Sequence, residues 1–91
     1  MVYKLKDNTE RELILETEDK ENCFYNHFKN ILCKIITVAE NTETGEPMVI
    51  YQELKNNTIW ARQIEMFLSK VDRDKYPDIE QVYRFEKVSV K

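Results

Sequence analysis

The sequence has few residues of the types that most catalytic and metal sites require. Its one glycine, Gly45, excludes a glycine-rich phosphate-binding loop. Its only serines, Ser69 and Ser89, lie outside the G-x-S-x-G pattern of a hydrolase nucleophile. One histidine and two cysteines cannot complete a closed zinc site without carboxylate ligands. We therefore expect no catalytic residue set, no metal site and no cofactor.

Long apolar runs are also missing. No run reaches the roughly 18 apolar residues that a membrane span needs. The N-terminal stretch MVYKLKDNTERE has no continuous apolar segment of the kind found in signal peptides. Without a secretion signal, Cys23 and Cys33 are expected to be free thiols in a reducing compartment. The sequence thus predicts a soluble cytoplasmic protein that makes no contact with membranes.

The residues that are present fit one small domain. The chain has 91 residues, of which 42% are hydrophobic, enough to form a core but too few for two full-sized domains. The formal net charge is −3, and it belongs to residues 1–22, where four basic side chains stand against seven acidic ones. Residues 23–91 are therefore neutral. This division predicts an acidic N-terminal extension, 1–22, on a β-rich domain that spans 23–91.

Hydrophobic patterning in the domain is typical of strands. Four segments rich in β-branched and aromatic residues are separated by short turns. These segments are 23–28, 31–38, 48–54 and 58–62. Apolar residues then recur at helical spacing over 64–71, and residues 82–90 alternate as a closing strand.

These elements predict a mainly β fold, a small five-stranded antiparallel barrel of the SH3 type with one short helix before the last strand. The alternative is an α+β sheet with the 64–71 helix packed on one face. Residues 1–22 are expected to form a β-hairpin from 2–6 and 12–17, or else a helix that starts at Thr9 with a capping box. The predicted core consists of Phe28, Ile35, Val38, Val49, Ile50, Leu54, Trp60, Ile64, Phe67, Leu68 and Phe85.

Five short motifs follow one another between residues 23 and 88. They are Y-x-H-F-K at Tyr25–Lys29, T-E-T-x-E at Thr42–Glu46, V-x-Y at Val49–Tyr51, W-x-R-Q-x-x-M-F at Trp60–Phe67, and Y-R-F-E at Tyr83–Glu86. In this order the chain resembles an uncharacterised bacterial family, the domain-of-unknown-function family 1653. Gln63 replaces the family's proline, and Asn30 replaces a common glycine while still tolerating a tight turn. The resemblance implies a compact β-rich bacterial domain without an assigned activity.

A two-residue turn at Lys29-Asn30 would bring several polar side chains together. In that register His27 pairs with Leu32 and lies beside Tyr25 and Lys34, while Cys33 faces the other side of the sheet. Cys33 is then out of reach as a nucleophilic partner of His27.

Trp60 and Arg62 share another strand face, and both are residue types enriched in binding hot spots. The candidate ligand-binding residues are therefore Tyr25, His27, Lys34, Trp60 and Arg62. The alternative is structural: His27 is hydrogen-bonded to a neighbour, Trp60 anchors the core, and Arg62 pairs with a carboxylate such as Glu65.

Three functions follow from these patterns. The first is a non-enzymatic binding module for a peptide, a small anion or, weakly, nucleic acid, because a neutral domain lacks the charge for strong phosphate-backbone binding. The second is an enzyme that uses His27 with Glu46 or Glu65. The third is a structural subunit that associates with itself through a hairpin in residues 1–22.

Overall fold

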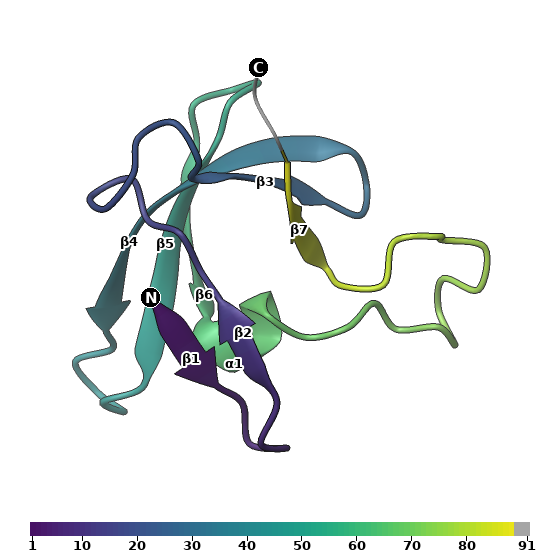
Figure 1. Cartoon of the computed structure of the whole chain (residues 1–91), viewed down its shortest axis with the longest axis horizontal. Coiled ribbons are helices and arrows are strands. Elements are labelled where there is room, and N and C mark those ends of the chain that lie inside the picture. The colour runs from purple at the N-terminus through teal and green to yellow at the C-terminus, as the bar shows by residue number, and fades with distance from the viewer. Residues whose placement is uncertain (89–91) are drawn as a thin grey trace.

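Two antiparallel sheets and one turn of helix make up the structure, a computed structural model that describes residues 1–88 (Figure 1). The small sheet pairs β1 (Val2–Lys4) with β2 (Glu10–Glu12). The large sheet has the strand order β6-β5-β4-β3-β7. Its strands are β3 (Phe24–His27), β4 (Ile31–Glu40), β5 (Pro47–Glu53), β6 (Ile59–Gln63) and β7 (Phe85–Lys87). The helix α1 (Ile64–Phe67) follows β6 directly.

The predicted mainly β class, the five antiparallel strands and the short helix before the last strand are confirmed. The sheet is not closed into a barrel, because β6 and β7 form its two edges within the described residues. It bends instead at a bulge in β4 between Ile35 and Thr37. The bend curls the sheet around α1 and the N-terminal hairpin (Figure 1).

The helix is shorter than the predicted 64–71 segment. It ends at Phe67, and the following residues run beside the segment before β7, with Arg84 N–H donating to the Ser69 carbonyl at 3.0 Å. The apolar positions that suggested a helix, including Leu68 and Val71, are nevertheless all buried. The helical spacing therefore identified which side chains enter the core but overestimated the length of the helix.

The turn between β3 and β4 differs from the prediction by one residue. His27 pairs with Ile31, so the loop has three residues, 28–30, and Asn30 closes it with a φ of 63°. Phe28 leaves the ladder, and its N–H donates to the Arg84 carbonyl at 2.9 Å. A slip of one residue exchanges the faces of a strand. Cys33 therefore shares the face of His27, which corrects the predicted arrangement.

One hydrophobic core lies on the concave face of the large sheet. Phe67 and Phe85 stack at its centre with ring centroids 3.9 Å apart, and Tyr51 lies 5.3 Å from each ring. Seven of the predicted core residues are buried, namely Phe28, Ile35, Val49, Ile64, Phe67, Leu68 and Phe85. Val38 and Ile50 are half-buried.

Two core predictions are wrong. Trp60 is 48% exposed and Leu54 is 37% exposed. Trp60 lies on β6, an edge strand with only one neighbour, and Leu54 lies at the start of the turn between β5 and β6. Neither position is covered by a second layer of structure.

The N-terminal segment forms a hairpin rather than a helix and enters the same core. Its second strand is shorter and earlier than the predicted 12–17 segment. Beyond it, Leu13 is fully buried and Leu15 is 8% exposed, both in the cluster that contains Phe67 and Phe85. Ile14 N–H donates to the Tyr25 hydroxyl at 3.0 Å. The division of the chain at residue 22 stays a prediction, but the two parts share one hydrophobic core.

The burial of Leu13 leads to a prediction about stability. Leu13→Ala should lower the free energy of unfolding by about 2–5 kcal/mol, because it leaves a cavity in a packed core. Urea denaturation measures this difference. The same substitution at the exposed Leu54 is the control and should cost less than about 1 kcal/mol. Equal losses in the two variants would mean that residues 1–22 lie outside the core.

Candidate functional site

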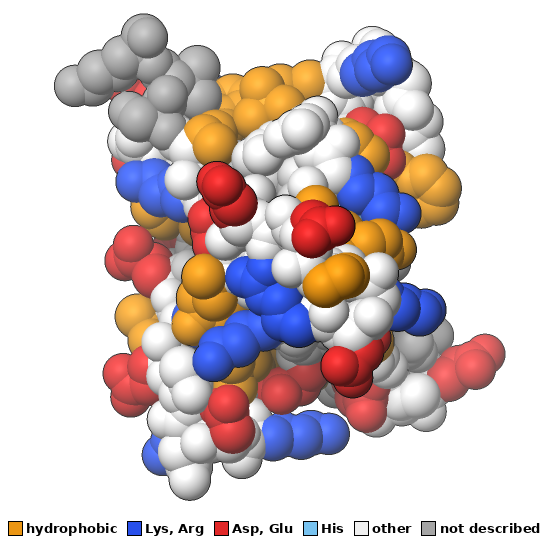
Figure 2. All heavy atoms as spheres, turned by 90° about the vertical axis from the view of Figure 1, so that its right-hand side faces the viewer, with side chains coloured by type: hydrophobic (Ala, Val, Ile, Leu, Met, Phe, Trp, Pro, Cys, Tyr) orange, Lys and Arg blue, Asp and Glu red, His pale blue; other side chains and the backbone are white. Residues whose placement is uncertain are grey.

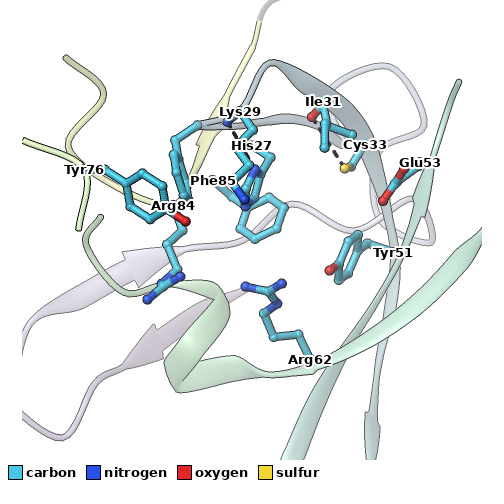
Figure 3. Close-up of a pocket in the computed structure, with 11 residues that line it drawn as sticks. His27, Lys29, Ile31, Cys33, Tyr51, Glu53, Arg62, Tyr76, Arg84 and Phe85 are labelled. Carbon is cyan, nitrogen blue, oxygen red and sulfur yellow. Dashed lines mark hydrogen bonds between the residues drawn. The ribbon is translucent and has the colours of Figure 1, made fainter. Parts of the chain in front are cut away.

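A cavity of about 260 Å³ opens on the concave side, beside the turn between β3 and β4 (Figure 3). We call it the basic cavity, because its lining includes the cations Lys29, Arg62 and Arg84 and one carboxylate, Glu53. Aromatic side chains form much of its wall. Figure 2 shows Lys and Arg side chains gathered near the middle of the molecular face that carries the loop between α1 and β7.

Two of the five predicted binding residues line this cavity, His27 and Arg62. Tyr25 lies in the core beneath them, 3% exposed. Lys34 lies on the opposite face of the sheet, where its Nζ pairs with the Glu16 carboxylate at 2.8 Å. Trp60 does not belong to the lining. The predicted group is therefore divided between the cavity, the core and the outer surface.

The remaining polar residues of the cavity escaped the sequence reasoning. Glu53 pairs with Cys33 across the ladder, so the corrected register places it on the face of His27. The alternation of side chains along a strand also predicts this position, because Glu53 lies two residues after the buried Tyr51 and therefore on the same face. Arg84 and Tyr76 come from the segment between α1 and β7, and no pattern in the sequence brings that segment to the cavity.

His27 is a neutral hydrogen-bond donor in this setting. Its Nδ1 accepts the Lys29 N–H at 3.1 Å, which leaves the ring proton on Nε2. Partial burial of the ring, followed by the positive charges of Arg62, Lys29 and Arg84, lowers its pKa to about 4, against a smaller opposite effect of the Glu53 carboxylate. The ring also lies against Phe85, with centroids 4.9 Å apart. The low pKa thus reflects the burial of the ring first and the neighbouring cations of the cavity second.

The two arginines of the cavity reach it from different elements. Arg62 extends from β6 with its guanidinium carbon 5.5 Å from the centre of the Phe85 ring. Arg84 precedes β7, and its Nε donates to the Ser69 hydroxyl at 2.8 Å. Within residues 1–88 neither guanidinium forms an ion pair with a carboxylate. Both are therefore available to an external anion.

The carboxylates proposed as partners of His27 and Arg62 lie elsewhere. Glu46 accepts a hydrogen bond from the Gln63 amide at 2.6 Å, and Glu65 accepts the Lys6 N–H at 3.2 Å. Both line a separate small pocket near β1. Glu65 lies on α1 and Glu46 lies in the turn before β5, and neither lines the cavity that holds His27 and Arg62. The expected pairing of His27 with Glu46 or Glu65, and of Arg62 with Glu65, is therefore wrong.

The two cysteines are buried free thiols. Burial, followed by the nearby Glu53 carboxylate, raises the pKa of Cys33 to about 11. Its Sγ lies 3.6 Å from the Ile31 carbonyl. The thiol therefore stays protonated at neutral pH and is a poor nucleophile, although it lines the cavity.

Comparison with known families confirms the resemblance seen in the motifs. The family described as protein of unknown function (DUF1653) matches residues 23–87. The chain belongs to the DUF1653 family. The matched region of this DUF1653 member contains β3 to β7 and every residue that lines the basic cavity, whereas β1, β2 and the buried Leu13 lie outside it. No curated protein and no solved structure matches the chain.

Two further searches concern the described part of this DUF1653 chain. No helix between residues 1 and 88 is long and apolar enough to cross a membrane. Nor do three or more His, Cys, Asp and Glu side chains in that range come together as a possible metal site.

The low pKa of His27 predicts how the stability of this DUF1653 domain depends on pH. Above pH 6.5 the imidazole is neutral in both the folded and the unfolded state. Between pH 6.5 and about 4 the unfolded chain binds a proton that the folded chain does not, so the free energy of unfolding falls as the pH falls. Below about pH 4 both states are protonated and this contribution stops changing.

His27→Gln should remove this part of the pH dependence. Between about pH 7 and about pH 5, the free energy of unfolding of the wild type should fall by about 1 kcal/mol more than that of the variant. This figure allows for solvent screening, because the His27 ring is only partly buried. Urea denaturation of both proteins at several pH values measures the difference. Parallel pH profiles would contradict the partial burial of His27 beside the cations of the cavity.

Proposed function

We propose that this chain is a small non-enzymatic binding module that holds an anionic group in the basic cavity. The observation that carries the proposal is the position of Arg62 and Arg84, which line one cavity and form no ion pair within the described residues. Lys29 adds a third cation, against the single carboxylate of Glu53.

Guanidinium groups suit this role because their planar donors match the two oxygens of a carboxylate or phosphate. Arg62 extends over the Phe85 ring and Arg84 is fixed by Ser69, so part of the ordering cost is met before the ligand binds. The Nε2–H of His27 is a further donor towards the cavity. The rings of Tyr51 and Tyr76 offer packing surface for an apolar part of the ligand.

The size of the cavity favours a small ligand. Pockets for drug-sized molecules usually measure about 300–1,000 Å³, and this one has about 260 Å³. Nucleic acid is the weaker candidate because tight binding to a phosphate backbone requires many cations, and the chain carries a net charge of −3. A small organic anion fits both the volume and the charge.

The geometry favours binding over catalysis. In the tautomer that Lys29 imposes, His27 presents an N–H group to the cavity instead of a free lone pair, so it is not placed as a general base. The Cys33 thiol is held protonated by its raised pKa. The cavity thus offers donors and cations but no activated nucleophile.

Two predictions from the sequence, the SH3-like fold and the cytoplasmic location, are part of this proposal. The bent five-stranded sheet is the arrangement from which an SH3-like barrel is built, and we take the fold as an open form of it. Two buried free thiols suit the reducing cytoplasm of a bacterial cell.

Titration with benzoate and with inorganic phosphate, followed by amide NMR shifts, tests the proposal. We expect shifts at Arg62, Phe85 and Arg84. Arg62→Gln should weaken binding by about tenfold or more, because it removes a charge-assisted hydrogen bond worth about 1.5–3 kcal/mol.

Arg73→Gln is the matched control, because it removes the same charge from an exposed position outside the cavity. This variant should bind like the wild type. The proposal fails if neither anion shifts these resonances, or if the two arginine variants lose affinity equally.

A further inference from the structure

We infer that the ligand of the basic cavity is a small amino acid, whose carboxylate meets Arg62 and whose ammonium group meets Glu53. This inference rests on the proposed function and extends it from an anion to a zwitterion. It also gives a role to Glu53, whose negative charge would only repel a ligand that is purely anionic.

Glu53 and Arg62 enter the cavity from opposite ends. Arg62 pairs with Val49 across the β5–β6 ladder, and Glu53 lies four residues further along β5 on the same face. At about 3.3 Å per residue, the two backbone positions are separated by about 13 Å along the strand. Tyr51 lies between them, and Figure 3 shows the carboxylate and the guanidinium on either side of its ring.

These opposite charges face one cavity without pairing. The ion pairs within residues 1–88 are Lys34 with Glu16 and the N-terminal amine with Glu18. Glu53 accepts only a long hydrogen bond, 3.3 Å, from the Asn56 amide. A partly buried charge without a partner is costly in free energy. A ligand that pairs with both the Glu53 carboxylate and the Arg62 guanidinium is therefore favoured over a ligand that pairs with only one of them.

A simple carboxylate would satisfy Arg62 but would leave Glu53 without a counter-charge in the same cavity. A simple amine would do the reverse and would be repelled by Lys29, Arg62 and Arg84. A zwitterion brings no net charge and offers each end its partner, while its carbon stem can lie against Tyr51 and Phe85. The separation of the two ends decides whether α-amino or ω-amino compounds fit.

Two matched pairs of compounds test the inference by calorimetry or NMR titration. L-Phenylalanine is compared with 3-phenylpropionate, and 4-(aminomethyl)benzoate is compared with 4-methylbenzoate. In at least one pair we expect the amine-bearing compound to bind about tenfold more tightly, as for a charge-assisted hydrogen bond. The preferred pair then distinguishes an α-amino acid from an ω-amino acid.

Glu53→Gln should abolish this preference without weakening the amine-free compound, and its amide spectrum shows whether the fold is kept. Glu43→Gln, which neutralises an exposed carboxylate in the turn before β5, is the control and should keep the preference. Equal affinities within both pairs would overturn the inference and leave the anion-binding module intact. If none of the four compounds binds, the inference is also overturned, and the benzoate and phosphate titrations decide whether the module itself fails.

Discussion

Asn30 closes the turn between β3 and β4 in a left-handed conformation, and this turn determines which side chains face the concave side of the sheet. Three residues in the loop place His27 and Cys33 on the same face, whereas two would have separated them. The same turn releases the Phe28 N–H to bind the Arg84 carbonyl. The segment before β7 is thereby tied to the hairpin, and Arg84 reaches the cavity. One turn thus couples the register of the sheet to the composition of the site.

The hydrophobic core and the basic cavity share a wall. Phe85 stacks on Phe67 within the core and also forms part of the cavity wall, where Arg62 extends over its ring. The N-terminal segment supports the core from below with Leu13 and Leu15. Because all charged groups of the cavity come from residues 23–87, the family match contains the entire site, while the stability of its base depends partly on residues outside that match.

The sequence predicted the positions of the strands better than their register and their order in the sheet. Alternation and β-branched content located the strands, and the spacing of Ile64, Phe67 and Leu68 identified buried positions even though the helix was shorter. Neither a two-residue nor a three-residue turn is excluded by the sequence Phe28-Lys29-Asn30, so the register depended on tertiary contacts. Trp60 was misjudged for a similar reason, since local sequence does not reveal which strand becomes an edge.

The candidate site was predicted in part. His27 and Arg62 stood out because imidazole, guanidinium and aromatic groups were close along predicted strands. Glu53 and Arg84 did not, because their approach depends on the register and on a loop without regular pattern. The opposition between a carboxylate and unpaired guanidinium groups becomes visible only when β5, β6 and the segment before β7 are placed in space.

The imidazole of His27 is the most direct probe of a positive cavity that binds anions, since the chain contains a single histidine. An NMR titration of its ring protons over pH, with and without benzoate, measures its pKa in both states. The structure predicts a pKa of about 4 for the free protein and an upward shift when the anion is bound, because the bound charge offsets the neighbouring cations. A pKa near 6.5 that does not respond to benzoate would contradict the account.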